Sequence, residues 1–221
     1  PVSAKGNGAA SITADHYPTP PSLVVRLAER ANDLAPAIRL AARGEGVTFL
    51  DIGAGEGAIC RELIRLGVPP SRITAIELRP ECRPALEALG VEVIIGDALG
   101  LPHEWQWTNW DVAIYNPPFG LWDRLRAAYR PRVRHLYAIG RAGMGAGAQE
   151  RAAKWREDQP DVYEIPERVS FIRIEYRDDA TGEVLASGGQ DAAGTAWFHW
   201  GPEWRTVGQR ITLRDRLADE Y

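Results

Sequence analysis

Short apolar runs alternate along the chain with stretches of helical periodicity. Each run is bounded by glycine, proline or polar residues, as is typical of buried strands: 47–52, 73–78, 91–95, 111–115 and 136–139. The pattern between the runs predicts helices over 56–66, 80–89 and 121–129, and helical spacing also extends from Leu23 to Leu40. Strands that alternate with helices predict a Rossmann-like α/β fold with a mostly parallel sheet and helices on both faces.

The pattern changes after residue 140. A glycine-rich segment, 140–147, precedes a predicted short helix over 151–156, and a polar segment joins two predicted antiparallel strands, 169–176 and 196–200. In the second strand, alternation places Phe198 and Trp200 on one face and Trp197 and His199 on the other, and we expect packing roles for them. His103, His135 and His199 are expected to be surface or structurally satisfied histidines. Residues 1–14 are small and polar and predict a disordered tail, which leaves 15–221 as a single domain.

The charge is distributed unevenly. The chain carries a net charge of -4, yet residues 121–156 hold nine basic residues and two acidic ones, so this segment carries +7 and the rest -11. The basic segment predicts a rim that faces a polyanion, or alternatively a solvated helix face.

Cys60 and Cys82 lie in helical segments without metal-ligand spacing, and we expect reduced thiols that pack in the core and no bound metal. The sequence shows no basic-then-apolar leader and no apolar run long enough to cross a bilayer, which favours a cytoplasmic protein with no membrane partner.

Three successive predicted strands each carry an acidic residue at their carboxyl end. The sequence 51–57, Asp-Ile-Gly-Ala-Gly-Glu-Gly, leads from the first strand into a helix, Glu77 ends the second strand and Asp97 ends the third. Ligands of open parallel sheets bind at the carboxyl edge, where these residues meet. Three carboxylates would repel a pyrophosphate but suit a cationic ligand with a ribose and an amino group. The glycines alone also fit the dinucleotide pattern of a nicotinamide dehydrogenase.

The tetrapeptide Asn116-Pro117-Pro118-Phe119 ends the fourth predicted strand. Two prolines predict a rigid turn. The Asn116 side-chain oxygen and the Pro117 carbonyl can each accept one hydrogen of an NH₂ group, which frees the nitrogen lone pair for attack on a methyl donor. Phe119 offers a face on which a flipped base can stack.

Together these motifs resemble the class I S-adenosylmethionine (SAM)-dependent methyltransferases over residues 17–139. The tetrapeptide is similar to the motif of the N6-adenine and N4-cytosine DNA methyltransferases, and Tyr17-Pro18-Thr19-Pro20 resembles the Thr-Pro element that precedes the cofactor loop in adenine-N6 enzymes. That element is equally well interpreted as a turn before a helix. The resemblance implies a seven-stranded, mostly parallel sheet with a C-terminal antiparallel hairpin, and SAM as cofactor.

The resemblance also implies a set of site residues. The expected cofactor contacts are Tyr17, Thr19, Pro20, Asp51, Gly53, Ala54, Gly55, Gly57, Glu77, Leu78, Asp97, Ala98 and Asn116. The expected catalytic residues are Asn116, Pro117, Pro118 and Phe119. The basic segment adds Arg141, Arg151 and Lys154 to Phe119 as expected substrate contacts.

The expected reaction is methylation of adenine N6 in nucleic acid, with DNA favoured over RNA as the acceptor. The alternatives are a protein-glutamine N5 methyltransferase, in which Tyr usually replaces Phe119, an RNA adenine-N6 methyltransferase, and a non-catalytic SAM- or nucleic-acid-binding subunit. Only about 80 residues follow Gly140, too few for a sizeable target-recognition domain. Sequence specificity is therefore expected to be short, poor or supplied by a protein partner.

Overall fold

The computed structural model describes residues 18–143, 158–165, 194–202 and 210–212. Outside these ranges lie the predicted tail (1–14), Tyr17, residues 144–147, the predicted helix 151–156 with Arg151 and Lys154, and the predicted strand 169–176.

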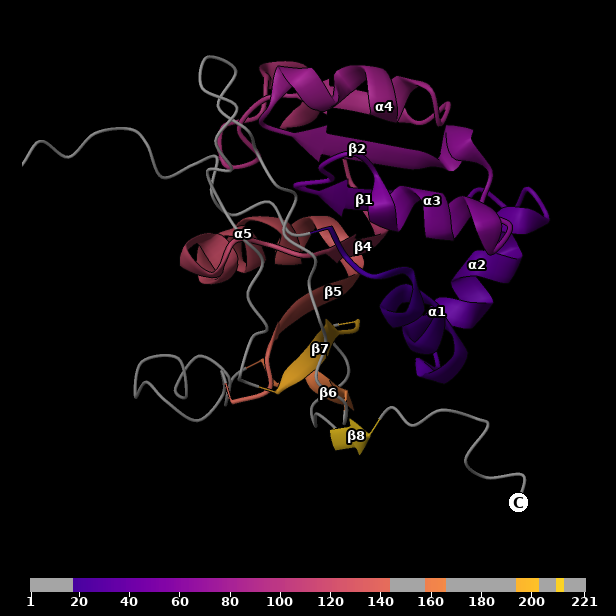
Figure 1. Ribbon diagram of the computed structural model, residues 1–221, viewed down its shortest axis with the longest axis vertical. Helices are drawn as coiled ribbons and strands as arrows, with labels where there is room; N and C mark the ends of the chain where they lie inside the picture. Colours follow the sequence, from indigo (N-terminus) through magenta and orange to yellow (C-terminus); the bar gives the residue numbers. More distant parts are fainter. Residues whose placement is uncertain (1–17, 144–157, 166–193, 203–209, 213–221) are drawn as a thin grey trace, which may run out of the picture.

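The strands of the described residues form one mixed sheet in the spatial order β3-β2-β1-β4-β5-β7-β6-β8 (Figure 1). Strands β1 to β5 are parallel, β7 is antiparallel to β5 and to β6, and β8 is parallel to β6. The first seven strands confirm the predicted arrangement, and the three-residue β8 extends the sheet at one edge. Their bounds are β1 Phe49–Ile52, β2 Ile73–Glu77, β3 Glu92–Ile95, β4 Trp110–Tyr115, β5 Val133–Arg141, β6 Asp161–Ile165, β7 Thr195–Trp200 and β8 Arg210–Thr212.

The antiparallel part of the sheet contains a strand that the sequence analysis missed. Strand β7 matches the predicted strand 196–200, and its antiparallel neighbours in the described chain are β5 and the unpredicted β6, with Val162 of β6 opposite Phe198. Strand β6 is short and lies between Pro160 and Pro166, so its alternating pattern extends over too few residues to stand out.

The helices follow the prediction with two differences. The helical spacing from Leu23 to Leu40 belongs to two helices, because Ala31 is extended and ends the first one. The predicted helix 80–89 begins as a 3₁₀ turn. The α-helices are α1 Pro21–Arg30, α2 Leu34–Ala42, α3 Ala58–Arg65, α4 Arg83–Glu87 and α5 Trp122–Tyr129, and the 3₁₀ helices are η1 Pro70–Arg72, η2 Pro80–Cys82, η3 His103–Trp105, η4 Phe119–Leu121 and η5 Arg130–Arg132.

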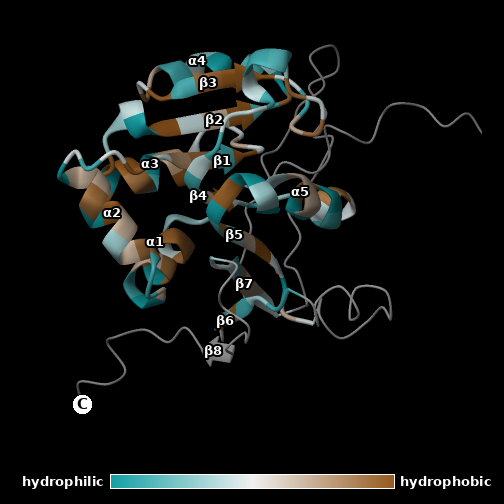
Figure 2. Ribbon diagram, turned by 180° about the vertical axis from the view of Figure 1, so that it is seen from behind, coloured by the Kyte–Doolittle hydropathy of each residue, from teal (hydrophilic) through white to brown (hydrophobic). Residues whose placement is uncertain are grey.

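Two apolar clusters cover the two faces of the sheet. Helices α1 to α4 pack on one face, which includes Phe49, Val112 and Tyr137, whereas α5 packs on the other face with Leu50 and Ala113. Adjacent residues of a strand point to opposite faces of the sheet. Because both faces of this sheet are covered, its strands are apolar at successive positions, which explains the continuous apolar runs in the sequence. In Figure 2, brown, apolar residues extend along the strands, whereas the helices mix brown with teal, hydrophilic residues.

The aromatic residues of β7 pack inside the protein. Trp197 lies in the first cluster, and Phe198 and Trp200 lie in the second, where both make edge contacts with the Trp122 ring at centroid distances of 5.5 Å. These contacts confirm the expected packing roles. Cys60 and Cys82 are buried free thiols, also as expected.

Some arginines of the basic segment stabilise the fold. Arg126 and Arg130 pair with Asp158 at 3.3 and 3.2 Å, and Arg132 donates to the Thr108 carbonyl at 2.9 Å while lying over the Tyr129 ring. These three side chains are largely enclosed, so the described rim is smaller than the sequence count suggests. None of the described helices has the length and apolar character that crossing a bilayer requires.

Candidate functional site

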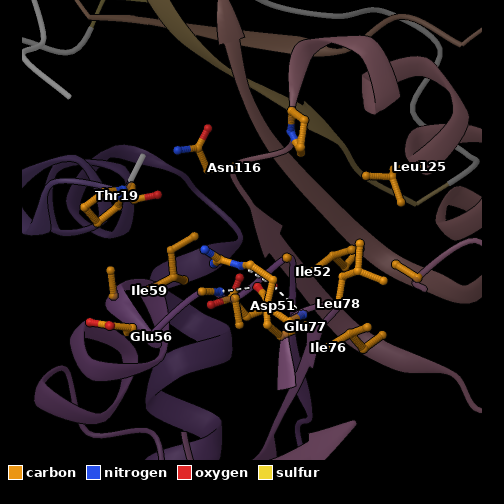
Figure 3. Close-up of a pocket in the computed structure, with 18 of the residues that line it drawn as sticks. Thr19, Asp51, Ile52, Glu56, Ile59, Ile76, Glu77, Leu78, Asn116 and Leu125 are labelled. Carbon is orange, nitrogen blue, oxygen red and sulfur yellow. Dashed lines mark hydrogen bonds and ion pairs between the residues drawn. The ribbon is translucent and has the colours of Figure 1, made fainter. Parts of the chain in front are cut away.

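A cavity of about 280 Å³ lies where the carboxyl ends of β1, β2, β3 and β4 meet. Parallel strands direct all these ends to one edge, so residues distant in sequence converge there. The lining includes Thr19, Asp51, Gly53, Ala54, Gly55, Glu77, Leu78, Asp97, Ala98, Asn116 and Pro118. In Figure 3, Thr19 and Asn116 lie on one side of the cavity and Glu77 and Leu78 on the other.

The glycine loop after β1 is attached to the neighbouring strand. Gly53 and Ala54 donate their N–H groups to the Ile76 carbonyl at 2.8 and 3.0 Å. Gly57, at the N-cap of α3, has a φ of 84°, and an added Cβ would lie 2.6 Å from Leu89 Cδ1. Gly57 is therefore needed for a left-handed turn and for close packing against the segment after α4, and it does not line the cavity.

Glu77 organises this part of the cavity. Its Oε2 accepts the Gly55 N–H at 2.6 Å, and its Oε1 accepts the backbone N–H and Nε–H of Arg79 at 3.0 and 2.9 Å. Burial alone would raise the pKa of Glu77, but the hydrogen bonds and charge of Arg79 and the Gly55 bond outweigh it and hold the pKa below 4.5. Glu77 is therefore an anion with room for one further donor at Oε2.

Asp51 is a buried acid on the cavity wall. Burial, with a smaller contribution from the charge of Glu77, raises its pKa from 3.8 to about 7, although the Cys60 thiol donates to its Oδ2 at 3.4 Å. Its Oδ1 is buried and has no hydrogen-bond partner among the described residues. A buried acceptor in a cavity wall favours a ligand that supplies a donor or a positive charge.

Asp97 and Ala98 form the wall after β3. Asp97 Oδ1 accepts the Leu99 N–H at 2.9 Å, and Tyr129 donates its hydroxyl to the Ala98 carbonyl at 2.8 Å, which attaches this turn to α5. Leu78 is 49% exposed, unusually open for a large apolar side chain, and it lines the cavity. An apolar side chain beside an exposed carboxylate suits a flat heterocycle that carries an amino group.

The predicted turn ends β4 at the same cavity. Asp51 pairs with Ile114 across β1 and β4, so continuing the register by two residues places Asn116 beside Gly53. Pro117 is buried and Pro118 lines the cavity, and the Leu121 N–H donates to the Pro118 carbonyl at 2.9 Å, which closes the turn. The side chain of Phe119 lies outside the described part of the chain.

Of the other predicted contacts, some line the cavity and some do not. Thr19 is buried in the cavity wall, whereas Pro20 is the N-cap of α1 and does not line the cavity. Arg141 is exposed at the end of β5, on the cavity's edge of the sheet but outside the lining. Tyr17, Arg151 and Lys154 lie outside the described residues.

Several lining residues escaped the sequence analysis: Pro18, Ile52, Glu56, Ala58, Ile59, Arg61, Ile76, Arg79, Gly96, Leu121 and Leu125. Arg61 is the most informative of them, because it is an exposed cation, whereas Arg79, the other cation of the lining, is paired with Glu77. It lies one helical turn after Gly57, a spacing that places it near the start of α3, and this signal could have found it.

Comparison with known proteins gives limited sequence similarity. The chain matches no protein-family model. A 66-residue segment is 36% identical to the ribosomal RNA small subunit methyltransferase A of Sinorhizobium medicae (strain WSM419). The match covers 27% of this chain and 23% of that protein, so it spans about a quarter of the relative's length.

Similar solved structures extend over most of the chain. A proposed RNA methyltransferase of Pyrococcus horikoshii has a TM-score of 0.53 and 18% identity, with 90% of this chain and 93% of that chain covered. The M protein of the type I restriction enzyme EcoKI has a TM-score of 0.54 and 13% identity, with 82% and 43% covered. A dimethyladenosine transferase of Plasmodium falciparum has a TM-score of 0.50 and 11% identity, with 85% and 63% covered. At these identities the likeness concerns the fold, and the chain has the class I SAM-dependent methyltransferase fold.

Proposed function

We propose that the chain is a SAM-dependent methyltransferase that methylates the N6 amino group of adenine in nucleic acid, with DNA as the leading acceptor. One observation carries this proposal: a single cavity joins three acidic strand ends to the Asn116–Pro118 turn. A nicotinamide dehydrogenase has no use for that turn, nor for an acid at Asp97. The names of the relatives, which include RNA and ribosomal RNA methyltransferases and the M protein of a restriction enzyme, support a nucleic-acid acceptor.

The charges of the wall fit the cofactor that the fold family uses. When bound, SAM supplies a methyl group on a positively charged sulfur. Asp51 would hold the ammonium group of its methionine part, because Oδ1 is a buried acceptor in need of a donor. Arg61 and the Thr19 hydroxyl would hold the methionine carboxylate, since both line the cavity and Arg61 is a cation there.

The other end of the cavity fits a nucleoside. Glu77 would accept a ribose hydroxyl at Oε2, the oxygen with one remaining acceptor position. Asp97 would accept from the adenine amino group, with the Leu78 side chain against the ring. Each of these residues would contact a different group of SAM, so single substitutions can remove the contacts one at a time.

The turn after β4 would bind the acceptor amine. The Asn116 side-chain oxygen and the Pro117 carbonyl each take one N–H hydrogen, so the nitrogen becomes more tetrahedral and its lone pair points into the cavity. Because the prolines and the Pro118–Leu121 hydrogen bond fix the turn, these acceptors are preorganised. No strong base is needed, because the amine would release its surplus proton to water once the methyl group has been transferred. An exocyclic amide or aromatic amine suits this arrangement better than a hydroxyl group, which has a single hydrogen to donate.

RNA is the second candidate acceptor, because the 66-residue match is to a ribosomal RNA methyltransferase. One assay separates the candidates. The chain is incubated with methyl-labelled SAM and, in parallel, duplex DNA, single-stranded DNA, ribosomal RNA or a protein extract, and labelled nucleosides are identified by mass spectrometry. We expect N6-methyladenine in DNA; label in RNA alone would favour the second candidate. Label in protein alone would contradict a nucleic-acid acceptor, and an Asn116→Ala variant controls for contaminating enzymes.

A further inference from the structure

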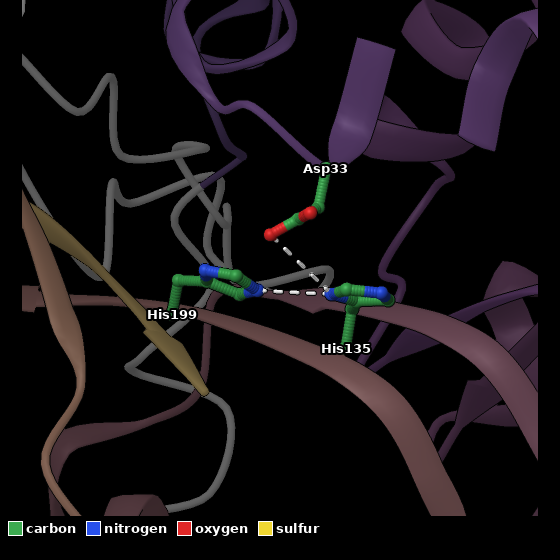
Figure 4. Close-up of side chains that lie close together, drawn as sticks. All are labelled: Asp33, His135 and His199. Atoms are coloured by element: carbon green, nitrogen blue, oxygen red, sulfur yellow. Dashed lines mark hydrogen bonds and ion pairs between the residues drawn. The ribbon is translucent and has the colours of Figure 1, made fainter. Parts of the chain in front are cut away.

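Two histidines and an aspartate converge outside the lining of the cavity. His135 lies near the start of β5, His199 lies on β7, and Asp33 lies in the turn between α1 and α2. His135 Nδ1 is 3.1 Å from His199 Nε2 and 3.9 Å from Asp33 Oδ2, and the three ligand atoms all lie within 4.8 Å of one another. Figure 4 shows the carboxylate above the two rings. We propose that Asp33, His135 and His199 bind a divalent transition-metal ion, zinc foremost.

The orientation of His199 is set by a second carboxylate. Its Nδ1 lies 3.2 Å from Asp161 Oδ2, and its ring stacks on Tyr137 at 4.2 Å and 6°. Because a carboxylate oxygen accepts, the proton lies on Nδ1, and the lone pair of Nε2 points toward His135. A carboxylate behind a histidine is the arrangement that orients metal-bound histidines in proteins.

The distances are close to those of a tetrahedral zinc site. Zinc–nitrogen bonds of about 2.0–2.1 Å place two histidine nitrogens about 3.4 Å apart, near the observed 3.1 Å. The Asp33 oxygen has to approach by roughly 1 Å to complete the site. That movement is available because Asp33 is 26% exposed.

The donor set selects the kind of ion. Imidazole nitrogens with one carboxylate suit zinc, cobalt and nickel, whereas magnesium and calcium prefer oxygen ligands only. Three protein ligands leave one position for water. The site lies near the start of β5, and the cavity lies at the carboxyl ends of the parallel strands, so the ion would join the α1–α2 turn to β5 and β7 outside the cavity lining.

The ligands come from positions 33, 135 and 199, so no local spacing in the sequence reveals them. The expectation of no bound metal rested on the spacing of Cys60 and Cys82, neither of which belongs to this cluster.

The test uses the full chain without a polyhistidine tag, stripped of metal by a chelator. Co²⁺ is titrated while visible absorption is recorded, and Zn²⁺ then competes for the site. We expect one ion per chain, loss of affinity by at least about tenfold in Asp33→Asn and His135→Gln, and unchanged binding in His103→Gln, an exposed histidine in η3. Asp161→Asn should weaken binding by roughly 10–100-fold, because it removes the orienting carboxylate.

Thermal unfolding separates binding from folding defects. Zinc should raise the melting temperature of the unaltered chain and of His103→Gln but not of Asp33→Asn. The proposal is overturned if the unaltered chain takes up no Co²⁺, or if Asp33→Asn and His135→Gln bind it as tightly as His103→Gln. If His135→Gln does not fold, the partly exposed Asp33→Asn decides the question.

Discussion

Gly55 donates its backbone N–H to Oε2 of Glu77 across 2.6 Å, which connects the glycine loop after β1 to the end of β2. Arg79 holds the other carboxylate oxygen, so the side chain is fixed before any ligand enters. A charged acceptor that is already fixed binds a ligand more tightly than a mobile one, because less conformational entropy is lost on binding. Glu77 is therefore the residue on which the proposed nucleoside contact depends most.

Replacing Glu77 by glutamine should weaken SAM binding by about 10–100-fold. The Glu77→Gln side chain keeps its shape but loses charge-assisted hydrogen bonds, each worth about 1.5–3 kcal/mol. Isothermal titration calorimetry measures the effect. Glu87→Gln is the matched control, because Glu87 forms an exposed ion pair with Arg83, and it should leave the affinity unchanged. Equal SAM affinities in Glu77→Gln and Glu87→Gln would show that Glu77 does not contact the cofactor.

SAM affinity should depend on pH through Asp51. Its pKa of about 7 means that half of the free protein carries a neutral Asp51 near neutral pH, and only the carboxylate attracts an ammonium group. Binding should therefore weaken as the pH falls below about 7, approaching tenfold per pH unit. Asp51→Asn should bind more weakly and show a flatter pH profile. A steep profile that persists in Asp51→Asn would assign the titration to another group.

The same group affects stability with a definite sign. Folded Asp51 keeps its proton up to about pH 7, whereas unfolded Asp51 releases it near 3.8, so the folded state binds more protons between these values. The contribution of Asp51 to the free energy of unfolding therefore falls as the pH rises from about 4 to about 7 and is constant above that range. Urea unfolding of the unaltered chain and of Asp51→Asn across this range measures the difference; a difference that rises with pH would contradict the assignment.

Gly57→Ala should destabilise the fold by about 2–4 kcal/mol. A left-handed backbone costs an alanine about 1–2 kcal/mol, and the new Cβ collides with Leu89 and Leu86. Gly44→Ala has a similar φ of 80° and nothing within 4 Å of the added Cβ, so it should cost only the backbone part. Urea unfolding of both variants gives the comparison. Equal losses would show that the contact with the segment after α4 is unimportant.

Arg141 should contribute to nucleic-acid binding. It is exposed at the cavity's edge of the sheet, whereas Arg134 is exposed near the start of the same strand, toward the opposite edge. Arg141→Gln should weaken DNA binding and reduce the slope of log affinity against log salt by about 1, as expected for one lost phosphate contact. Arg134→Gln makes the same change in net charge and should do neither. Equal effects would indicate attraction by overall charge.

The sequence predicts most of the cavity because its residues stand at strand ends. Asp51 and Glu77 lie near the carboxyl ends of apolar runs, and Asp97 and Asn116 come shortly after such runs. Parallel topology brings these positions together without knowledge of side-chain packing. Gly57 lies outside the cavity lining, and its expected cofactor contact stays a prediction, because a glycine that allows a turn and one that contacts a ligand have the same sequence signal.

The residues that sequence reasoning missed depend on tertiary contacts. Strand β8 has three residues, too few for any periodicity, and its partner β6 lies far from it in sequence. The burial of His199 depends on β7 being covered on both faces, and the enclosure of Arg126 depends on its pairing with Asp158. Pairings over such separations leave no local pattern to interpret.

The most direct measurement compares SAM affinity and methyl transfer in Asn116→Ala. The proposed division of labour assigns the cofactor to the acidic strand ends and the acceptor amine to Asn116, so the variant should bind SAM within about twofold of the unaltered chain and turn over at least about 100-fold more slowly. Asn109→Ala, an exposed asparagine just before β4, should change neither quantity. Loss of SAM binding in Asn116→Ala, or transfer to nucleic acid at the unaltered rate, would contradict the proposed site.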